Sequence, residues 1–160
     1  MATPVGFDPG TWNNATAAPF TLGAHYDYQG KTYRYFRNAN GASDNAVADG
    51  DVSVFTATAV SGTTLNPNVV SNNLAGTGTG APGNPPAGVG VGAVTKNYYG
   101  FFQTQGLHTN VKSTSSTAGV KQKVSATAAT CTDQTAATIS DIGTAETATS
   151  GGRCSVELRL

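Results

Sequence analysis

The segment NYYGFFQTQG, residues Asn97–Gly106, decides the fold, because it gathers four aromatic residues in a chain otherwise rich in Thr, Ala, Gly and Ser. Read as a strand with a two-residue period, Tyr99 and Phe101 point to one side of the sheet. Tyr98 and Phe102 then point to the other side. A strand with one face in water carries apolar residues on one side only. The segment therefore predicts a central strand covered on both faces, with one cover supplied by its own domain or by a second subunit.

A second aromatic stretch, HYDYQGKTYRYF, precedes this strand at residues 25–36. A two-residue turn at Gln29-Gly30 pairs Tyr26 with Tyr33 and predicts a hairpin. Cross-strand partners share a face, so the hairpin gathers its tyrosines on one side. They either cover the core with their hydroxyls at its rim or form an exposed strip for a partner or a sugar, and we favour the first. The residues concerned are Tyr26, Tyr28, Tyr33 and Tyr35.

Alternating or β-branched residues predict further strands along the chain. No segment shows an apolar stripe of helical period with caps. The sequence therefore predicts an all-β protein, a small β-sandwich or β-barrel-like domain of short strands and long loops. The further strands are expected around Val52 and Val54, at Val69–Val70, at Val120–Val124, and in RCSVELRL, where Cys154, Val156, Leu158 and Leu160 share one face.

The first 22 residues are predicted to be an extended N-terminal arm, because they hold three prolines and no periodic pattern. Phe7, Trp12 and Phe20 stand along it as isolated apolar anchors. Two interpretations remain open. The arm wraps over its own core, or it docks on a neighbouring subunit.

Residues 23–160 are predicted to form a single β domain, interrupted by a Gly/Pro-rich loop at about 61–92. Within it, GTGTGAPGNPPAG at residues 76–88 is expected to form neither a helix nor a central strand. Loops of this length are uncommon and usually functional. This one is expected to lie extended along another subunit.

The composition limits the classes of function. Charged residues make up 11% of the 160 residues and the formal net charge is zero, so the high net charge of disordered chains is missing. A neutral chain lacks the excess of Lys and Arg that binds nucleic acid or an anionic membrane. It is also poorly protected from association, which favours life in an assembly. The start, MATPVGFDPG, lacks the features of a signal peptide, so synthesis in the cytosol is expected.

No motif for catalysis, a metal or a cofactor is recognised, and the chain is expected not to be an enzyme. His25 and His108 have no neighbours at a metal-ligand spacing, and Asp49 and its neighbours are interpreted as turn-capping residues. Cys131 and Cys154 either form a disulfide or remain two buried thiols. In a reducing cytosol the thiols are favoured.

Three stretches in order resemble small structural proteins of tailed bacteriophages, including capsid decoration (cement) proteins. They are DYQGKTYRYFRNANGASDNAVADGDVSV, VTKNYYGFFQTQGLHTNVKS and IGTAETATSGGRCSVELRL. The resemblance covers most of the region from Tyr26 to Leu160. The Gly/Pro-rich insertion before Ala93 and the Thr/Ala-rich stretch before Ile139 depart from the pattern.

The resemblance implies a protein without catalytic residues or cofactors, bound as trimers to the outer surface of an icosahedral shell. The partners expected are the major capsid protein and further copies of this chain, with no nucleic acid or membrane. The alternative is a carbohydrate- or receptor-binding module of a tail fibre or cell surface. A glycosidase, whose paired carboxylates would come from distant loops, is less favoured. Contacts with the shell or between subunits are expected at Phe7, Trp12, Phe20, Tyr98 and Phe102.

Overall fold

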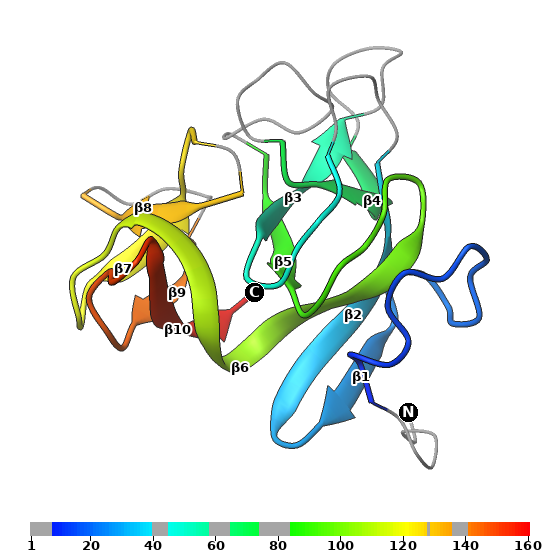
Figure 1. Cartoon of the computed structure of the whole chain (residues 1–160), viewed down its shortest axis with the longest axis horizontal. Helices are drawn as coiled ribbons and strands as arrows, with labels where there is room; N and C mark the ends of the chain where they lie inside the picture. The colour runs from blue at the N-terminus through cyan, green and yellow to red at the C-terminus, as the bar shows by residue number, and fades with distance from the viewer. Residues whose placement is uncertain (1–7, 40–44, 58–64, 74–83, 128, 136–140) are drawn as a thin grey trace.

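The computed structural model of the chain describes residues 8–39, 45–57, 65–73, 84–127, 129–135 and 141–160. These residues form ten strands and no helix, which confirms the predicted all-β class (Figure 1). The strands are β1 (His25–Tyr28), β2 (Lys31–Asn38), β3 (Val52–Ala57), β4 (Leu65–Ser71), β5 (Pro86–Gly90), β6 (Tyr99–Ser115), β7 (Lys121–Val124), β8 (Cys131–Asp133), β9 (Asp141–Ala145) and β10 (Arg153–Arg159).

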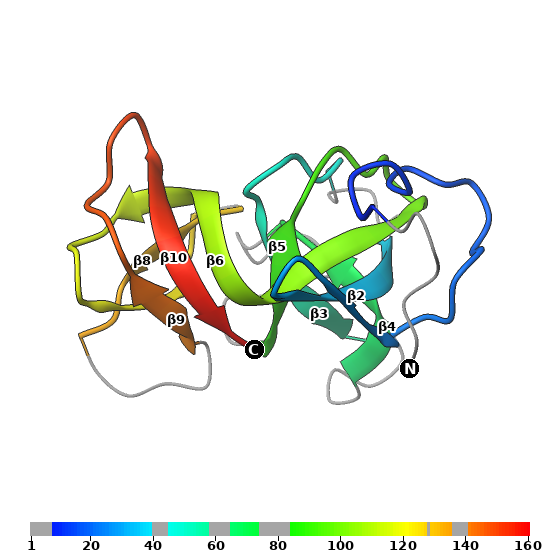
Figure 2. The same cartoon turned by 90° about the horizontal axis from the view of Figure 1, so that it is seen from below.

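The strand pairings close into two barrels that share β6. The N-terminal barrel runs from β2 through β4, β3 and β5 to β6 and back to β2. The C-terminal barrel runs from β6 through β10, β9 and β7 to β8 and back to β6. Each barrel has one parallel pairing, β2–β4 in the first and β6–β8 in the second. In Figures 1 and 2 the two barrels lie side by side, with the long β6 ribbon passing from one to the other.

The two faces of β6 explain the run of aromatic residues. Phe102 is fully buried in the cluster of the N-terminal barrel, against which Tyr98 packs. Phe101 is fully buried on the other face, among the tyrosines of the β1–β2 hairpin. The central strand with two covered faces is therefore as predicted, and this chain supplies a cover for both faces. The first cluster contains Phe36, Val47, Val70, Ala87, Val94 and Phe102; the second, called the aromatic cluster below, contains Tyr26, Tyr33, Tyr35 and Phe101.

The β1–β2 hairpin has the register predicted from the sequence. Tyr26 pairs with Tyr33, and Tyr28 pairs with Lys31. The turn residue Gln29 has φ 50° and the glycine after it has φ 74°, as a two-residue type I′ turn requires. The tyrosines face the core, as favoured above, and burial raises the pKa of Tyr35 to about 12, with Tyr99 and Tyr26 adding to the shift.

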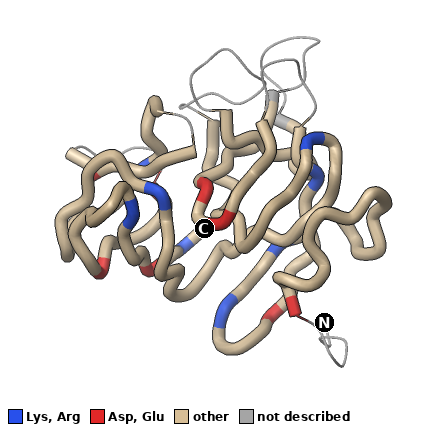
Figure 3. Tube along the Cα trace, viewed as in Figure 1, with Lys and Arg blue, Asp and Glu red and all other residues tan. Residues whose placement is uncertain are grey.

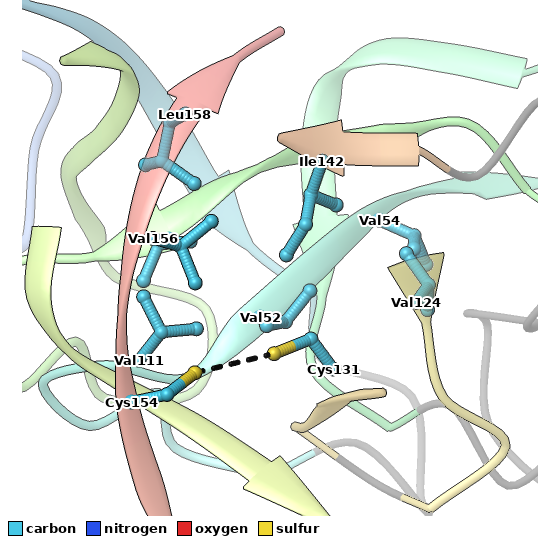
Figure 4. Close-up of a cluster of buried hydrophobic side chains, with 10 residues drawn as sticks. Val52, Val54, Val111, Val124, Cys131, Ile142, Cys154, Val156 and Leu158 are labelled. Atoms are coloured by element: carbon cyan, nitrogen blue, oxygen red, sulfur yellow. Dashed lines mark hydrogen bonds between the residues drawn. The ribbon is translucent and has the colours of Figure 1, made fainter. Parts of the chain in front are cut away.

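The C-terminal barrel has an aliphatic core. In β10, Cys154, Val156 and Leu158 are buried and the residues between them are more exposed, as the alternating pattern predicted. Valines from β3 and β5 join this core, so the two barrels are held together by shared packing. The cluster contains Val52, Val54, Val89, Val111, Val124, Cys131, Ile142, Cys154, Val156 and Leu158 (Figure 4).

The segment 61–92 differs from the single loop that its composition predicts. It contains β4, longer than the expected strand at Val69–Val70, and β5, which lies centrally between β3 and β6. Pro86 begins β5, a position that tolerates proline in a strand. Gly88 is needed for close packing, because a Cβ there would lie 2.8 Å from the Cβ of Phe102. Residues 74–83 of this segment lie outside the described residues.

The described part of the arm, residues 8–22, lies against its own domain. Ala15 forms a bridge with Tyr99. The side-chain oxygen of Asn13 accepts a hydrogen bond from the backbone N–H of Phe101, at 2.6 Å. Phe20 packs edge-on against Phe101 in the aromatic cluster, with ring centroids 5.1 Å apart. This matches the first interpretation of the arm and leaves docking on a second subunit as a prediction.

Candidate functional site

A polar groove of about 310 Å³ lies where the arm, the β1–β2 hairpin and β6 meet. Its lining combines carboxylates, a lysine, a histidine and two tyrosines. Residues from separate parts of the chain are brought together there only by the fold. The lining includes Asp8, Tyr28, Lys31, Tyr33, Asp49 and His108.

The arm contributes Asp8, which is fixed by its own turn. One carboxylate oxygen accepts the backbone N–H of Gly10 at 3.0 Å, and the other accepts the hydroxyl of Thr11 at 3.0 Å. Aspartate favours such local bonds in turns. The carboxylate is exposed, so its charge stays at the rim of the groove.

The hairpin contributes two tyrosines and a lysine. Tyr33 is buried, and Tyr28 and Lys31 are half-buried at the turn. Burial raises the pKa of Tyr33, and the neighbouring Tyr28 and Asp8 add to the shift. Tyr33 therefore keeps a neutral hydroxyl that can donate and accept hydrogen bonds at neutral pH.

Strand β6 contributes His108, which is 6% exposed. Its Nδ1 accepts the backbone N–H of Asn110 at 3.2 Å, so Nε2 carries the proton toward the carbonyl of Gly90, also at 3.2 Å. Burial lowers the pKa of the imidazole, while Asp49, with an oxygen 3.9 Å from Nε2, opposes that shift. The imidazole is therefore neutral at pH 7.

Asp49 is held at the groove by a network that joins the barrels. Its carboxylate accepts a hydrogen bond from the side chain of Asn110, at 2.5 Å. Arg153 donates to the backbone carbonyls of both residues, at 3.1 and 2.9 Å. Gly50 permits this approach, because it has φ 80° and a Cβ there would lie 1.8 Å from the carbonyl oxygen of Asn110.

This arrangement can bind a ligand that offers several hydroxyl groups. Carboxylate and carbonyl oxygens accept from hydroxyls, Lys31 donates to them, and the tyrosine rings offer an apolar face. Within the described ranges no group of three or more His, Cys, Asp or Glu side chains comes together as a metal site would require. Of the residues described, none belongs to a helix long and apolar enough to cross a bilayer.

The residues predicted as partner contacts are not brought together into one site. Phe7 lies outside the described residues. Trp12 is 45% exposed and lies edge-on to Phe20, with centroids 5.5 Å apart. Tyr98 is half-buried and Phe102 fully buried, so the surface that this group offers to a partner is mainly that of Trp12.

Sequence reasoning missed the groove. Asp49 was interpreted only as a turn residue, and His108 was considered only as a metal ligand. The local sequence around Asp49 and around His108 gives no signal that these residues face the arm and the hairpin, because their neighbours in space are distant in sequence. The sequence ADGD, at residues 48–51, predicts only a turn, and it does not indicate that Gly50 must have a positive φ.

No protein-family model matches the chain, and no curated protein matches it significantly.

Proposed function

We propose that the protein is a capsid decoration protein that binds the outer surface of the icosahedral shell of a tailed bacteriophage. In this proposal it is made in the host cytoplasm and, as a homotrimer, bridges copies of the major capsid protein. Two features support it. The three sequence stretches described above occur in the order found in such proteins, and the fold is all-β with an arm at its N-terminal end.

The observation that carries the proposal is the presentation of Trp12. The ring is 45% exposed, and the adjacent Asn13 and Asn14 fix the backbone through hydrogen bonds to Phe101 and Thr95. An aromatic side chain on a fixed backbone loses little conformational entropy on docking. Tryptophan is also enriched among the residues that dominate binding energy at protein interfaces.

The distribution of charge supports a protein partner over nucleic acid. Lys and Arg are interspersed with Asp and Glu along the described trace in Figure 3, and the formal net charge is zero. A nucleic-acid interface would be expected to concentrate Lys and Arg on one face. A mixed neutral surface is compatible with docking on a protein shell.

The test is co-sedimentation of the purified chain with shells that lack decoration. The wild-type chain is expected to saturate at a copy number comparable to that of the shell protein, and Trp12→Ala to bind roughly tenfold more weakly or worse. Leu107→Ala is the matched control, because Leu107 is the other exposed large apolar residue among those described, at 39%. Equal retention of the two variants would remove Trp12 from the interface, and failure of the wild-type chain to bind shells would overturn the proposal.

Deletion of residues 1–20 is a less specific test than Trp12→Ala. The deletion also removes Asn13, which bonds to β6, and Phe20, which packs against the aromatic cluster. We expect the truncated chain to bind shells weakly and also to be less stable. Circular dichroism of the free protein separates these two effects.

The groove favours a second candidate, a carbohydrate- or receptor-binding module of a tail fibre or cell surface. Its Asp49 carboxylate and Tyr28 ring are suited to a sugar's hydroxyls and apolar face. In this case the wild-type chain should bind glycans, Asp49→Asn should weaken that binding, and shells should not retain the protein. Titration with a glycan panel, followed by the shifts of groove amides in NMR spectra, distinguishes the two functions.

A further inference from the structure

The two cysteines come together although they are 23 positions apart in the sequence. Cys131 lies in β8 beside Ser113 of β6, and Cys154 lies in β10 beside Val111 of β6. The strands that carry them therefore flank β6 on opposite sides. The sulfur atoms are 4.0 Å apart, and the side chains point toward one another in Figure 4. We propose that these thiols form a disulfide by exchange with a small-molecule disulfide, and that the bond locks the C-terminal barrel after folding.

The sulfur atoms lie near bonding distance. A disulfide requires them to approach to about 2.05 Å, which is about 2 Å closer than in this structure. Both cysteines are free thiols in the folded chain. In this proposal the bond is added to a barrel that has already folded.

The surroundings of the pair differ from those of thiols that only fill an apolar core. Ser113 and Ser116 are buried beside them, at 4% and 7% exposure. Thr149 joins the two serines, donating to the Ser113 hydroxyl at 3.0 Å and lying 2.9 Å from that of Ser116. These hydroxyl groups give the sulfur atoms polar neighbours inside the barrel.

The pKa values of the two thiols are shifted in opposite directions. The two sulfurs share a hydrogen bond in which either atom can be the donor. This contact with Cys131 and the hydroxyls of Ser116 and Ser113 lower the pKa of the Cys154 thiol. The same hydrogen bond, together with burial, raises the pKa of Cys131. The thiol of the pair that loses its proton more readily is therefore that of Cys154. Thiolates, not thiols, attack disulfides.

The exchange proceeds in two balanced steps. The Cys154 thiolate attacks one sulfur of the small disulfide, forming a mixed disulfide and releasing one small thiolate. Cys131 then loses its proton and attacks the Cys154 sulfur, which closes the protein disulfide and expels the second small thiolate. The two protein thiols are oxidised, and the small disulfide is reduced to two thiols.

The reagent reaches the pair when β8 separates from the barrel. This strand has only three residues, and its ladders to β6 and to β7 are both short. Short ladders open at lower free-energy cost than the long β6–β10 pairing on the other side of β6. Cys154 is 3% exposed in the intact barrel, so this separation is needed before the reagent can reach it.

The test is incubation of the folded full chain with oxidised glutathione in buffer without urea. Intact mass and maleimide labelling then count the thiols. We expect a loss of about 2 Da, no labelling, and a rise in Tm of roughly 6–12 °C that dithiothreitol reverses. Two labelled thiols, a persistent mixed disulfide in the wild-type chain, or a lowered Tm would overturn the proposal.

Single variants test the assigned roles. Cys131→Ala should stop at a glutathione adduct on Cys154 and show no rise in Tm. Cys154→Ala should react more slowly, because burial still raises the pKa of the remaining thiol. Ser116→Ala should slow maleimide labelling of Cys154 below pH 7, whereas Thr127→Ala, on an exposed turn near β8, should leave it unchanged. Equal labelling rates for the two single cysteine variants would remove the assignment of Cys154 as the attacking thiol.

Discussion

Each barrel is closed by a continuous circuit of paired strands, but the side chains that fill the two barrels are of different kinds. The buried cluster of the C-terminal barrel contains no aromatic residue among those described, and strands supply all of its members. The N-terminal barrel carries aromatic rings on both faces of β6. The second of these faces is partly covered by Phe20, which belongs to no strand. The large aromatic side chains thus extend the buried core beyond the space that one barrel encloses. Because Phe20 of the arm packs against them, the arm is part of the domain.

The strongest way to break the N-terminal barrel is Phe102→Ala. Removal of a fully buried ring should lower the free energy of unfolding by about 3–5 kcal/mol, measured by urea denaturation. Val156→Ala, in the other barrel, removes a smaller side chain and should cost about 2 kcal/mol. Because the barrels share β6, both variants should unfold in one transition. Two separate transitions would show that the barrels are independent units.

The dependence of the N-terminal barrel on the arm is tested by Asn13→Ala. The variant loses the acceptor for the N–H of Phe101 and should be less stable by about 1–2 kcal/mol. Asn13→Asp is the control, because it keeps an oxygen acceptor at the same place. Hydrogen exchange should speed up at Phe101 and leave β9 unchanged. Unchanged stability in the alanine variant would mean that the arm is only a tail.

The C-terminal barrel should tolerate loss of its cysteines under reducing conditions. Cys131→Ala combined with Cys154→Ala removes two buried sulfur atoms and should lower the unfolding free energy by about 1–2 kcal/mol, through a cavity. Thermal denaturation in dithiothreitol measures it. If the double variant fails to fold under these conditions, the thiols have a structural role larger than packing.

The smallest effect is expected from pH at the junction of the barrels. Burial lowers the pKa of His108 below its usual 6.5, so the unfolded chain binds the proton first as the solution is acidified. The contribution of His108 to the free energy of unfolding is therefore complete above pH 6.5 and is lost as the pH falls below that value. His108→Gln should reduce the slope of the urea midpoint against pH between 7 and 5. An unchanged slope would assign the dependence to other groups.

The elements that the sequence predicted best are those whose pattern is local. The hairpin at Gln29-Gly30 is fixed by a turn and an alternation within a few residues, and β10 by alternation alone. Strand β5 could not be predicted, because Gly88 has low strand propensity and is needed there only for the approach of Phe102. The groove could not be predicted either, since Asp8, Asp49 and His108 meet through tertiary contacts alone.

The shared strand β6 also constrains the order of folding. During synthesis the N-terminal barrel cannot close before Tyr99–Gln105 has left the ribosome, because those residues pair with β2 and β5. The C-terminal barrel must wait longer, until Arg153–Arg159 is made. The aromatic faces of the early strands therefore stay open through much of translation. With so many pairings between distant segments, folding is expected to be slow, and the pairing of β6 is expected to be the step on which both barrels depend.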